Sequence, residues 1–210
     1  MKAAMHTKLR VIVTSSCLLI ALCSASLARK QKQTQAEDLD EYAVYSAVLQ
    51  ARYSTSSKKE IKRYVIAVET KNAFIGYRHG FVRSGETQPT VESETSQDFD
   101  SKNKDSFELT DKFTLPVPYS LVSELTLRKI FDRAKDGKPD EEGWHRFYKN
   151  YPGAPGIISF TRVGFDAKKT QALLYVAHQS DFLGGSGRFF VLSKQGDTWK
   201  IEKEVILWLS

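Results

Sequence analysis

The sequence predicts an α+β fold, in which an N-terminal helix and short central helices pack on an antiparallel sheet that ends in a C-terminal meander. Apolar residues recur at helical spacing over residues 38–53. Residues 151–210 contain four runs rich in β-branched and aromatic residues, joined by two short turns and one glycine-rich loop. Strands joined this closely pair as antiparallel neighbours, so the runs predict a four-stranded meander whose apolar face needs a helical layer.

Residues 1–28 predict a secretory signal peptide. Lys2, Lys8 and Arg10 precede an apolar run over residues 11–22, and Ser26-Leu27-Ala28 resembles a small-x-small cleavage site. The apolar run is shorter than a membrane span, which favours cleavage over a retained anchor. We therefore expect an exported protein, periplasmic or secreted, with no transmembrane segment after cleavage.

Cleavage after Ala28 would leave residues 29–210, a length suited to one domain. It would remove three of the 31 basic residues and no acidic one, which leaves 28 basic against 25 acidic side chains and a net charge of +3. This balance and the expected export argue against a nucleic-acid partner. Cys17 and Cys23 both lie in the signal, so the mature domain would have no disulfide, thiolate nucleophile or cysteine metal site.

A single domain is expected over residues 38–210, after a polar and disordered lead-in at 29–37. Its first helix begins with acidic residues, as the helix dipole favours. Extended chain and short helices should follow: a strand at 63–70, a strand or loop at 73–83, a loop at 84–97 that leads into a short helix through 98–100, extended chain at 107–119, a helix at 124–134 capped by Ser123, and a helix at 141–149.

The sequence predicts that the strands of the meander differ in how many of their faces are buried. The first, at 156–165, follows a Pro-Gly turn cluster. The second, at 172–178, is a continuous apolar run typical of a strand covered on both faces, and the third lies at 188–194. In the last strand apolar Trp199, Ile201 and Val205 alternate with charged residues, which indicates one buried and one exposed face.

Some segments of the second half carry a resemblance: Tyr151-Pro152-Gly153, Ser159 to Phe165, Gln171-Ala172-Leu173, Gly185-Ser186-Gly187, Trp208-Leu209-Ser210 and, more loosely, Phe113 to Tyr119. They resemble an uncharacterised group of small exported bacterial proteins. The resemblance implies export and a shared fold, but no reaction. Such relatives often have a Cys-Gly-x-x-Cys-Gly type segment where this chain has Ser180 to Gly185, which argues against a redox role.

The loop after the second meander strand holds the candidate catalytic residues. Ser186 could act as a nucleophile, His178 as the base that takes its proton, and Asp181 as the acid that orients the base. The loop lacks the G-x-S-x-G elbow that exposes a nucleophilic serine. A flexible loop with a surface histidine is therefore favoured over a hydrolase.

Two further patterns suggest binding chemistry less strongly. The glycines from Gly184 to Gly187 could hold an anion on backbone N–H groups, with Arg188 alongside. Glu141, Glu142 and His145 would share a helix face as metal ligands, but a solvated helix end explains them better, so no metal or other cofactor is expected.

Aromatic residues and one arginine complete the binding candidates. Trp144, Tyr148 and Tyr151 lie near the Pro-Gly turn and would line a pocket, although core packing is the favoured interpretation. Arg162 interrupts an apolar strand, so it needs a partner carboxylate if it is buried, or it faces a cleft.

The leading prediction is an exported, non-enzymatic protein that binds a small ligand or another component of the cell envelope. A small exported hydrolase working from the His178–Ser186 loop is the first alternative. A structural or interaction subunit of an envelope assembly is the second.

Overall fold

The computed structural model describes residues 39–56, 59–71, 89–131 and 141–210. The chain divides into two compact units, Met1–Asp40 and Glu41–Ser210, and the fold described below is that of the second. The predicted signal peptide with both cysteines, the lead-in, the segment 73–83 and the end of the predicted helix 124–134 lie outside the described residues.

The unit is built on one mixed seven-stranded sheet with the order β4-β3-β5-β7-β8-β9, and β6 pairs with β7. Its strands are β3 (Tyr64–Ala67), β4 (Tyr119–Val122), β5 (Ile157–Phe160), β6 (Gly164–Phe165), β7 (Gln171–Gln179), β8 (Gly185–Gln195) and β9 (Thr198–Leu209). The predicted α+β fold and its C-terminal meander are confirmed, because β5, β7, β8 and β9 pair antiparallel in succession. However, β3 pairs in parallel with both β4 and β5, which corrects the expectation of an antiparallel sheet throughout.

The helices lie close to their predicted places. The N-terminal helix is described over residues 39–52, followed by α2 (Ser93–Lys102), α3 (Glu124–Phe131) and α4 (Glu141–Asn150). α2 begins at Ser93, inside the predicted loop 84–97. The sequence does not reveal this start, because only Thr95 and Phe99 are buried and the helix therefore carries little apolar pattern. A short ladder of β1 (Thr55–Ser56) and β2 (Lys59–Glu60) follows the N-terminal helix.

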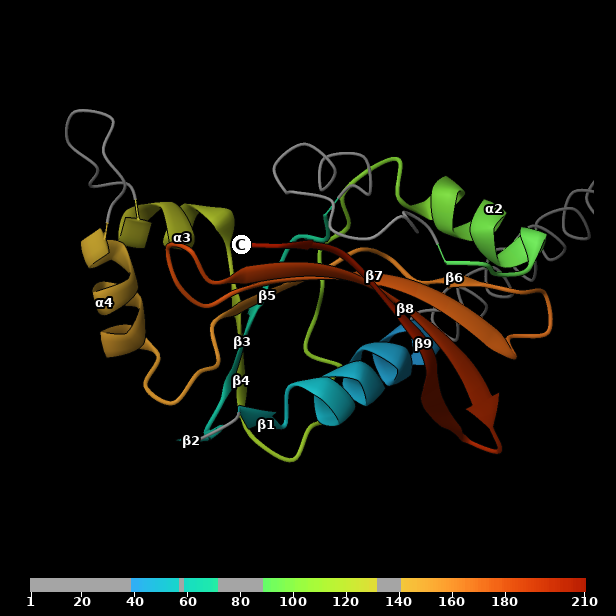
Figure 1. The fold of residues 1–210 in the computed structure, drawn as a ribbon, viewed down its shortest axis with the longest axis horizontal. Coiled ribbons are helices and arrows are strands. Elements are labelled where there is room, and N and C mark those ends of the chain that lie inside the picture. The colour runs from blue at the N-terminus through green and yellow to red at the C-terminus, as the bar shows by residue number, and fades with distance from the viewer. Residues whose placement is uncertain (1–38, 57–58, 72–88, 132–140) are drawn as a thin grey trace, which may run out of the picture. The chain divides into compact units, whose positions relative to one another are not determined.

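Helices cover both faces of the meander (Figure 1). The N-terminal helix packs Tyr45, Val48 and Leu49 into one cluster with the β7 residues Leu174 and Val176. On the opposite face Phe99 of α2 joins a second cluster with Leu173 and Tyr175. Successive residues of β7 therefore enter different cores, which confirms the prediction that this strand is covered on both sides. A third cluster joins α3 and α4 to β3 and β4 through Phe147, Ile130, Val65 and Val122.

The first predicted meander strand, 156–165, is divided into β5 and β6 by a break at residues 161–163. Asn103, buried just after α2, takes the place of a neighbouring strand at this break. Its Oδ1 accepts the backbone N–H of Arg162 at 2.7 Å, and its Nδ2 donates to the carbonyl of Arg162 at 3.0 Å. The break therefore leaves no backbone group of Arg162 without a partner.

A buried carboxylate joins the N-terminal helix to this break. Glu41 is 2% exposed, and its Oε1 lies 2.5 Å from the guanidinium of Arg162. Its Oε2 accepts the Tyr45 hydroxyl at 3.1 Å and the Val163 N–H at 3.3 Å. Burial and the neighbouring Glu41 charge raise the pKa of Tyr45, so this hydroxyl stays a donor. Lys102 of α2 lies 3.9 Å from the same carboxylate.

We predict that Glu41→Gln lowers the free energy of unfolding by about 3 kcal/mol, because it leaves the Arg162 charge without its partner inside the fold. Chemical denaturation measures the loss. Glu202→Gln, on an exposed position of β9, is the matched control and should change stability by less than about 0.5 kcal/mol. Equal effects of the two substitutions would contradict the role given to Glu41.

Candidate functional site

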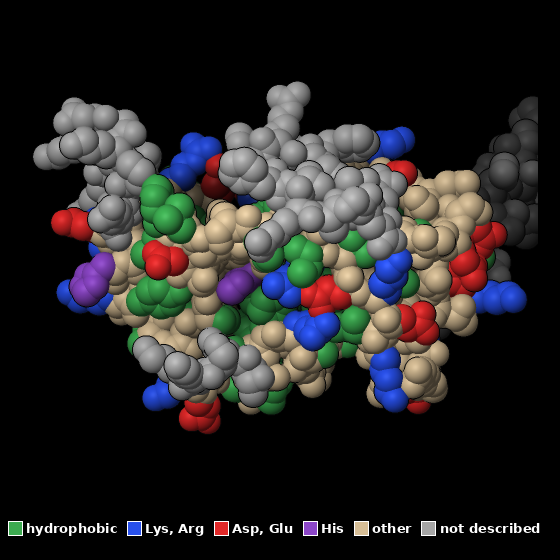
Figure 2. Space-filling model, viewed as in Figure 1, with side chains coloured by type: hydrophobic (Ala, Val, Ile, Leu, Met, Phe, Trp, Pro, Cys, Tyr) green, Lys and Arg blue, Asp and Glu red, His purple; other side chains and the backbone are tan. Residues whose placement is uncertain are grey.

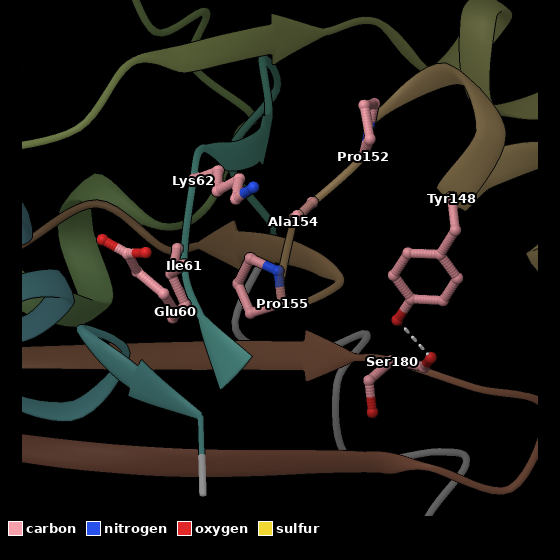
Figure 3. A pocket seen from close by; sticks show the side chains of 9 residues that line it. Glu60, Ile61, Lys62, Tyr148, Pro152, Ala154, Pro155 and Ser180 are labelled. Carbon is pink, nitrogen blue, oxygen red and sulfur yellow. Dashed lines mark hydrogen bonds between the residues drawn. The ribbon is translucent and has the colours of Figure 1, made fainter. Parts of the chain in front are cut away.

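Two adjoining hollows lie where β7 ends beside α4 and the chain at residues 60–62. The larger has a volume of about 760 Å³ and is lined by Glu60, Ile61, Lys62, Tyr148, Pro152, Gly153, Ala154, Pro155 and Ser180 (Figure 3). The smaller has a volume of about 270 Å³ and is lined by Arg52, Tyr53, Ile61, Pro155, His178, Ser180, Ser186 and Arg188. The hollows share the lining residues Ile61, Pro155 and Ser180 and so lie side by side; together they are here called the groove.

The wall between α4 and β5 is a glycine- and proline-rich linker held at both ends. The N–H of Lys62 donates to the carbonyl of Gly153 at 3.0 Å. Gly156 has a φ of 135°, and a Cβ there would lie 2.2 Å from the Gln179 carbonyl oxygen. The linker therefore approaches the end of β7 too closely for any side chain at this position, which fixes Pro155 against the groove.

Tyr148 closes the larger hollow from α4. Its hydroxyl donates to the carbonyl of Ser180 at 2.6 Å, and Figure 3 shows the ring reaching toward Ser180 across from Pro155. Burial raises the pKa of Tyr148, with a smaller contribution from Asp181. The Tyr148 side chain is therefore uncharged. It lines the hollow with its apolar ring, and the hydrogen bond of its hydroxyl holds the ring in place.

Two arginines meet one carboxylate at the smaller hollow. Arg52 stands at the end of the N-terminal helix and Arg188 lies in β8, and each pairs with a different oxygen of Glu204 on β9. The Nε of Arg188 is buried and has no hydrogen-bond partner among the described residues. In Figure 2, basic and acidic side chains lie beside a histidine near the middle of the face shown. Two guanidinium groups against one carboxylate leave this hollow with a net positive charge.

His178 lies on the same face of the sheet, partly buried at the end of β7. Its Nε2 lies 3.1 Å from the carbonyl oxygen of Pro155, so Nε2 carries the hydrogen and donates it. The ring packs against Tyr53, with 5.2 Å between the ring centroids. Burial and then the charge of Arg188 lower the pKa of His178, while burial raises the pKa of Tyr53 to about 12. Both rings are therefore neutral near pH 7.

The structure brings together two of the three candidate catalytic residues. His178 and Ser186 are direct partners across β7 and β8, but no hydrogen bond joins their side chains within the described part of the chain. Asp181 is exposed, and its carboxylate accepts the N–H of Phe182 at 2.7 Å. The Ser180 N–H donates to the Gly184 carbonyl at 2.7 Å, so the loop expected to be flexible is a hydrogen-bonded turn. The acid thus stabilises the turn and does not orient His178.

The glycines at 185 and 187 make room for the indole ring of Trp208. A Cβ on Gly187 would lie 2.0 Å from the indole Nε1 of Trp208, and the Nε1–H donates to the Tyr175 hydroxyl at 2.8 Å. Gly185 leaves room for the same ring. Because side chains alternate along a strand, Ser186 and Arg188 point to the opposite face, toward the smaller hollow.

The other predicted site residues lie outside the groove, apart from Tyr148. Arg162 has the carboxylate partner that its position required, in Glu41, and so serves the fold. Trp144 and Tyr151 pack on Phe147 with centroid separations of 5.4 and 5.2 Å, as the core interpretation expected.

The suggested metal ligands show no metal geometry. Glu142 and His145 are exposed on α4, and Glu142 pairs with Arg146 at 3.5 Å, while the Glu141 side chain lies outside the described residues. The described part of the chain contains no group of three or more histidine, cysteine, aspartate or glutamate residues that could hold a metal ion.

Sequence reasoning missed Arg52, Tyr53 and Glu204. Arg52 and Tyr53 lie at the end of a helix, and Glu204 lies in a strand in which charged and apolar residues alternate. Each residue type is common at such a position, so none of the three suggests a site. Only the tertiary fold brings them together, and no local pattern marks them.

We predict that His178 makes the protein less stable in mildly acidic solution. In the unfolded chain its pKa returns to about 6.5, whereas burial holds the folded value lower. Between these two values the unfolded state binds more protons, so the free energy of unfolding falls as the pH drops through that window. Denaturation at a series of pH values should show this extra loss in the wild type and not in His178→Gln. Identical pH profiles for the two proteins would contradict the buried neutral imidazole.

Comparison of the chain with protein-family models, with curated proteins and with solved structures found no match. Of the helices that the structure describes, none is long and apolar enough to cross a membrane.

Proposed function

We propose that the protein is an exported, non-enzymatic binding protein whose groove holds a small organic anion. The observation that carries this proposal is the pairing of Arg52 and Arg188 with the single carboxylate of Glu204 beside an open hollow. The expected export rests on the signal-like pattern of residues 1–28.

The unused donors of the two arginines favour an anion over a neutral ligand. A guanidinium group has five N–H donors in a fixed fork, and Glu204 engages only part of each fork. The Arg52 and Arg188 side chains are 48% and 30% exposed, so an oxyanion in the hollow can reach the guanidinium donors that Glu204 does not engage. The hydroxyl of Ser186 lines the same hollow and can support such an ion, whereas the Ser180 hydroxyl already donates to the Gly184 carbonyl at 3.3 Å.

The larger hollow suits the remainder of the ligand. Ile61, Ala154, Pro155 and the ring of Tyr148 provide apolar walls, and the Glu60 and Lys62 charges stand at its edge. Small-molecule sites commonly combine an apolar cleft of this size with a few convergent polar groups. The groove thus offers one charged end and one mostly apolar end.

The arrangement around His178 favours binding over hydrolysis. A triad histidine takes the serine proton on one nitrogen and is oriented by an acid through the other. Here Nε2 donates to a backbone carbonyl, and Asp181 is committed to its own turn. We therefore expect Ser186→Ala and the wild type to show the same absence of turnover on ester and peptide substrates.

The proposal is tested by calorimetric titration with a panel of small organic carboxylates. We predict that at least one member binds, and that Arg188→Met weakens its binding by about tenfold or more, because a charge-assisted hydrogen bond is lost. Arg128→Met, on an exposed position of α3, is the matched control and should bind as the wild type does. Glu204 keeps Arg52 in Arg188→Met, so the variant should fold, which denaturation checks.

Two results would overturn the proposal. The first is a titration in which no carboxylate binds, or in which Arg188→Met binds every carboxylate as tightly as the wild type does. The other is ester or peptide turnover that disappears in Ser186→Ala, which would establish the hydrolase instead.

A further inference from the structure

The charge and shape of the groove select among anions. The smaller hollow has two guanidinium groups, from Arg52 and Arg188, and one carboxylate, from Glu204. The other titratable groups that face it, His178 and Tyr53, are neutral near pH 7 because both lie in a desolvated position. The hollow therefore has a formal charge of +1, which a single negative charge neutralises.

A doubly charged ligand would fit this hollow poorly. A phosphate dianion would bring two negative charges to a site with one net positive charge, so half of the ligand charge would find no partner in the groove. The Glu60 and Lys62 charges in the adjoining hollow cancel each other and do not change this balance. Protonated His178 would supply a second positive charge, but burial and Arg188 both oppose its protonation.

The arginines already show how they bind a planar carboxylate. Glu204 bridges them, with Oε2 on Arg52 and Oε1 on Arg188. Planar two-oxygen groups match the guanidinium fork, and this match gives directional selectivity beyond the charge itself. An incoming carboxylate would repeat this mode on the exposed guanidinium donors that Glu204 does not engage.

A carboxylate group alone would fill only a small part of the groove. The smaller hollow of about 270 Å³ has room for several carbon atoms, and it borders the larger hollow at Pro155 and Ile61. These two residues line both hollows, so a ligand that passes from one to the other stays in contact with apolar surface. The ligand should therefore have an apolar body attached to its charged end.

We infer that the ligand is a monocarboxylic acid with an apolar body, its carboxylate between Arg52 and Arg188 and its body along Pro155 and Ile61. The inference rests on the proposed function and narrows it to one chemical class. It concerns the groove alone and requires no enzymatic step.

A matched series of probes tests the inference on the wild-type protein. Phenylbutyrate, phenylpropylphosphonate, phenylbutyramide and acetate differ in charge, in head-group shape or in the presence of a body. In mildly alkaline buffer, where the phosphonate is a dianion, calorimetry should show phenylbutyrate binding about tenfold or more tightly than the other three. Arg52→Met and Arg188→Met should each lower the affinity for phenylbutyrate, while Arg128→Met should not.

The outcomes separate the inference from the proposal on which it rests. If the phosphonate binds as tightly as phenylbutyrate, the carboxylate class is wrong and the anion groove stands. If acetate binds as tightly as phenylbutyrate, the ligand does not need an apolar body, and that part of the inference is wrong. If the neutral amide binds equally well, or if no probe binds, both the inference and the anion-binding proposal fail.

Discussion

The buried carboxylate of Glu41 is the contact on which the arrangement of the helix and the sheet depends. It neutralises Arg162 and accepts hydrogen bonds from Tyr45 and Val163, so a charge that is 2% exposed has several partners. These partners lie at the break between β5 and β6, while Glu41 itself lies near the start of the N-terminal helix. A buried ion pair of this kind contributes less to stability than to specificity, because desolvation offsets much of its attraction. We infer that it fixes one register of the helix on the sheet.

That register also determines the groove. Residues 41 to 52 span about 17 Å of helix, so a helix held at Glu41 carries Arg52 and Tyr53 to a defined place at its other end. There Arg52 meets Glu204 on β9, and Tyr53 packs on His178 of β7. Helix and sheet thus each supply one arginine to the smaller hollow. The interaction that orders the fold lies apart from the groove, yet it positions the side chains that would bind a ligand.

Sequence patterns predicted the parts of this structure that depend on neighbouring residues. The apolar run of β7 indicated a strand covered on both faces, and Arg162 in an apolar strand indicated a carboxylate partner. The parallel pairing of β3 with β4 and β5 was missed, because these strands are separated by long segments and no residue pattern encodes their direction. The glycines at 185 and 187 make room for Trp208, a contact that no local pattern indicates and that only the register of β8 and β9 reveals. The convergence of Arg52 and Glu204 was invisible for the same reason.

The most direct measurement of the central claim is the pKa of the His178 imidazole, followed by NMR with and without saturating phenylbutyrate. A carboxylate in the smaller hollow would place a negative charge beside His178, and a nearby negative charge favours the imidazolium form. The ligand should therefore raise the pKa of His178, while the resonances of His145, exposed on α4, serve as an internal reference. A His178 pKa that stays the same while phenylbutyrate is bound would place the ligand elsewhere and overturn the carboxylate site.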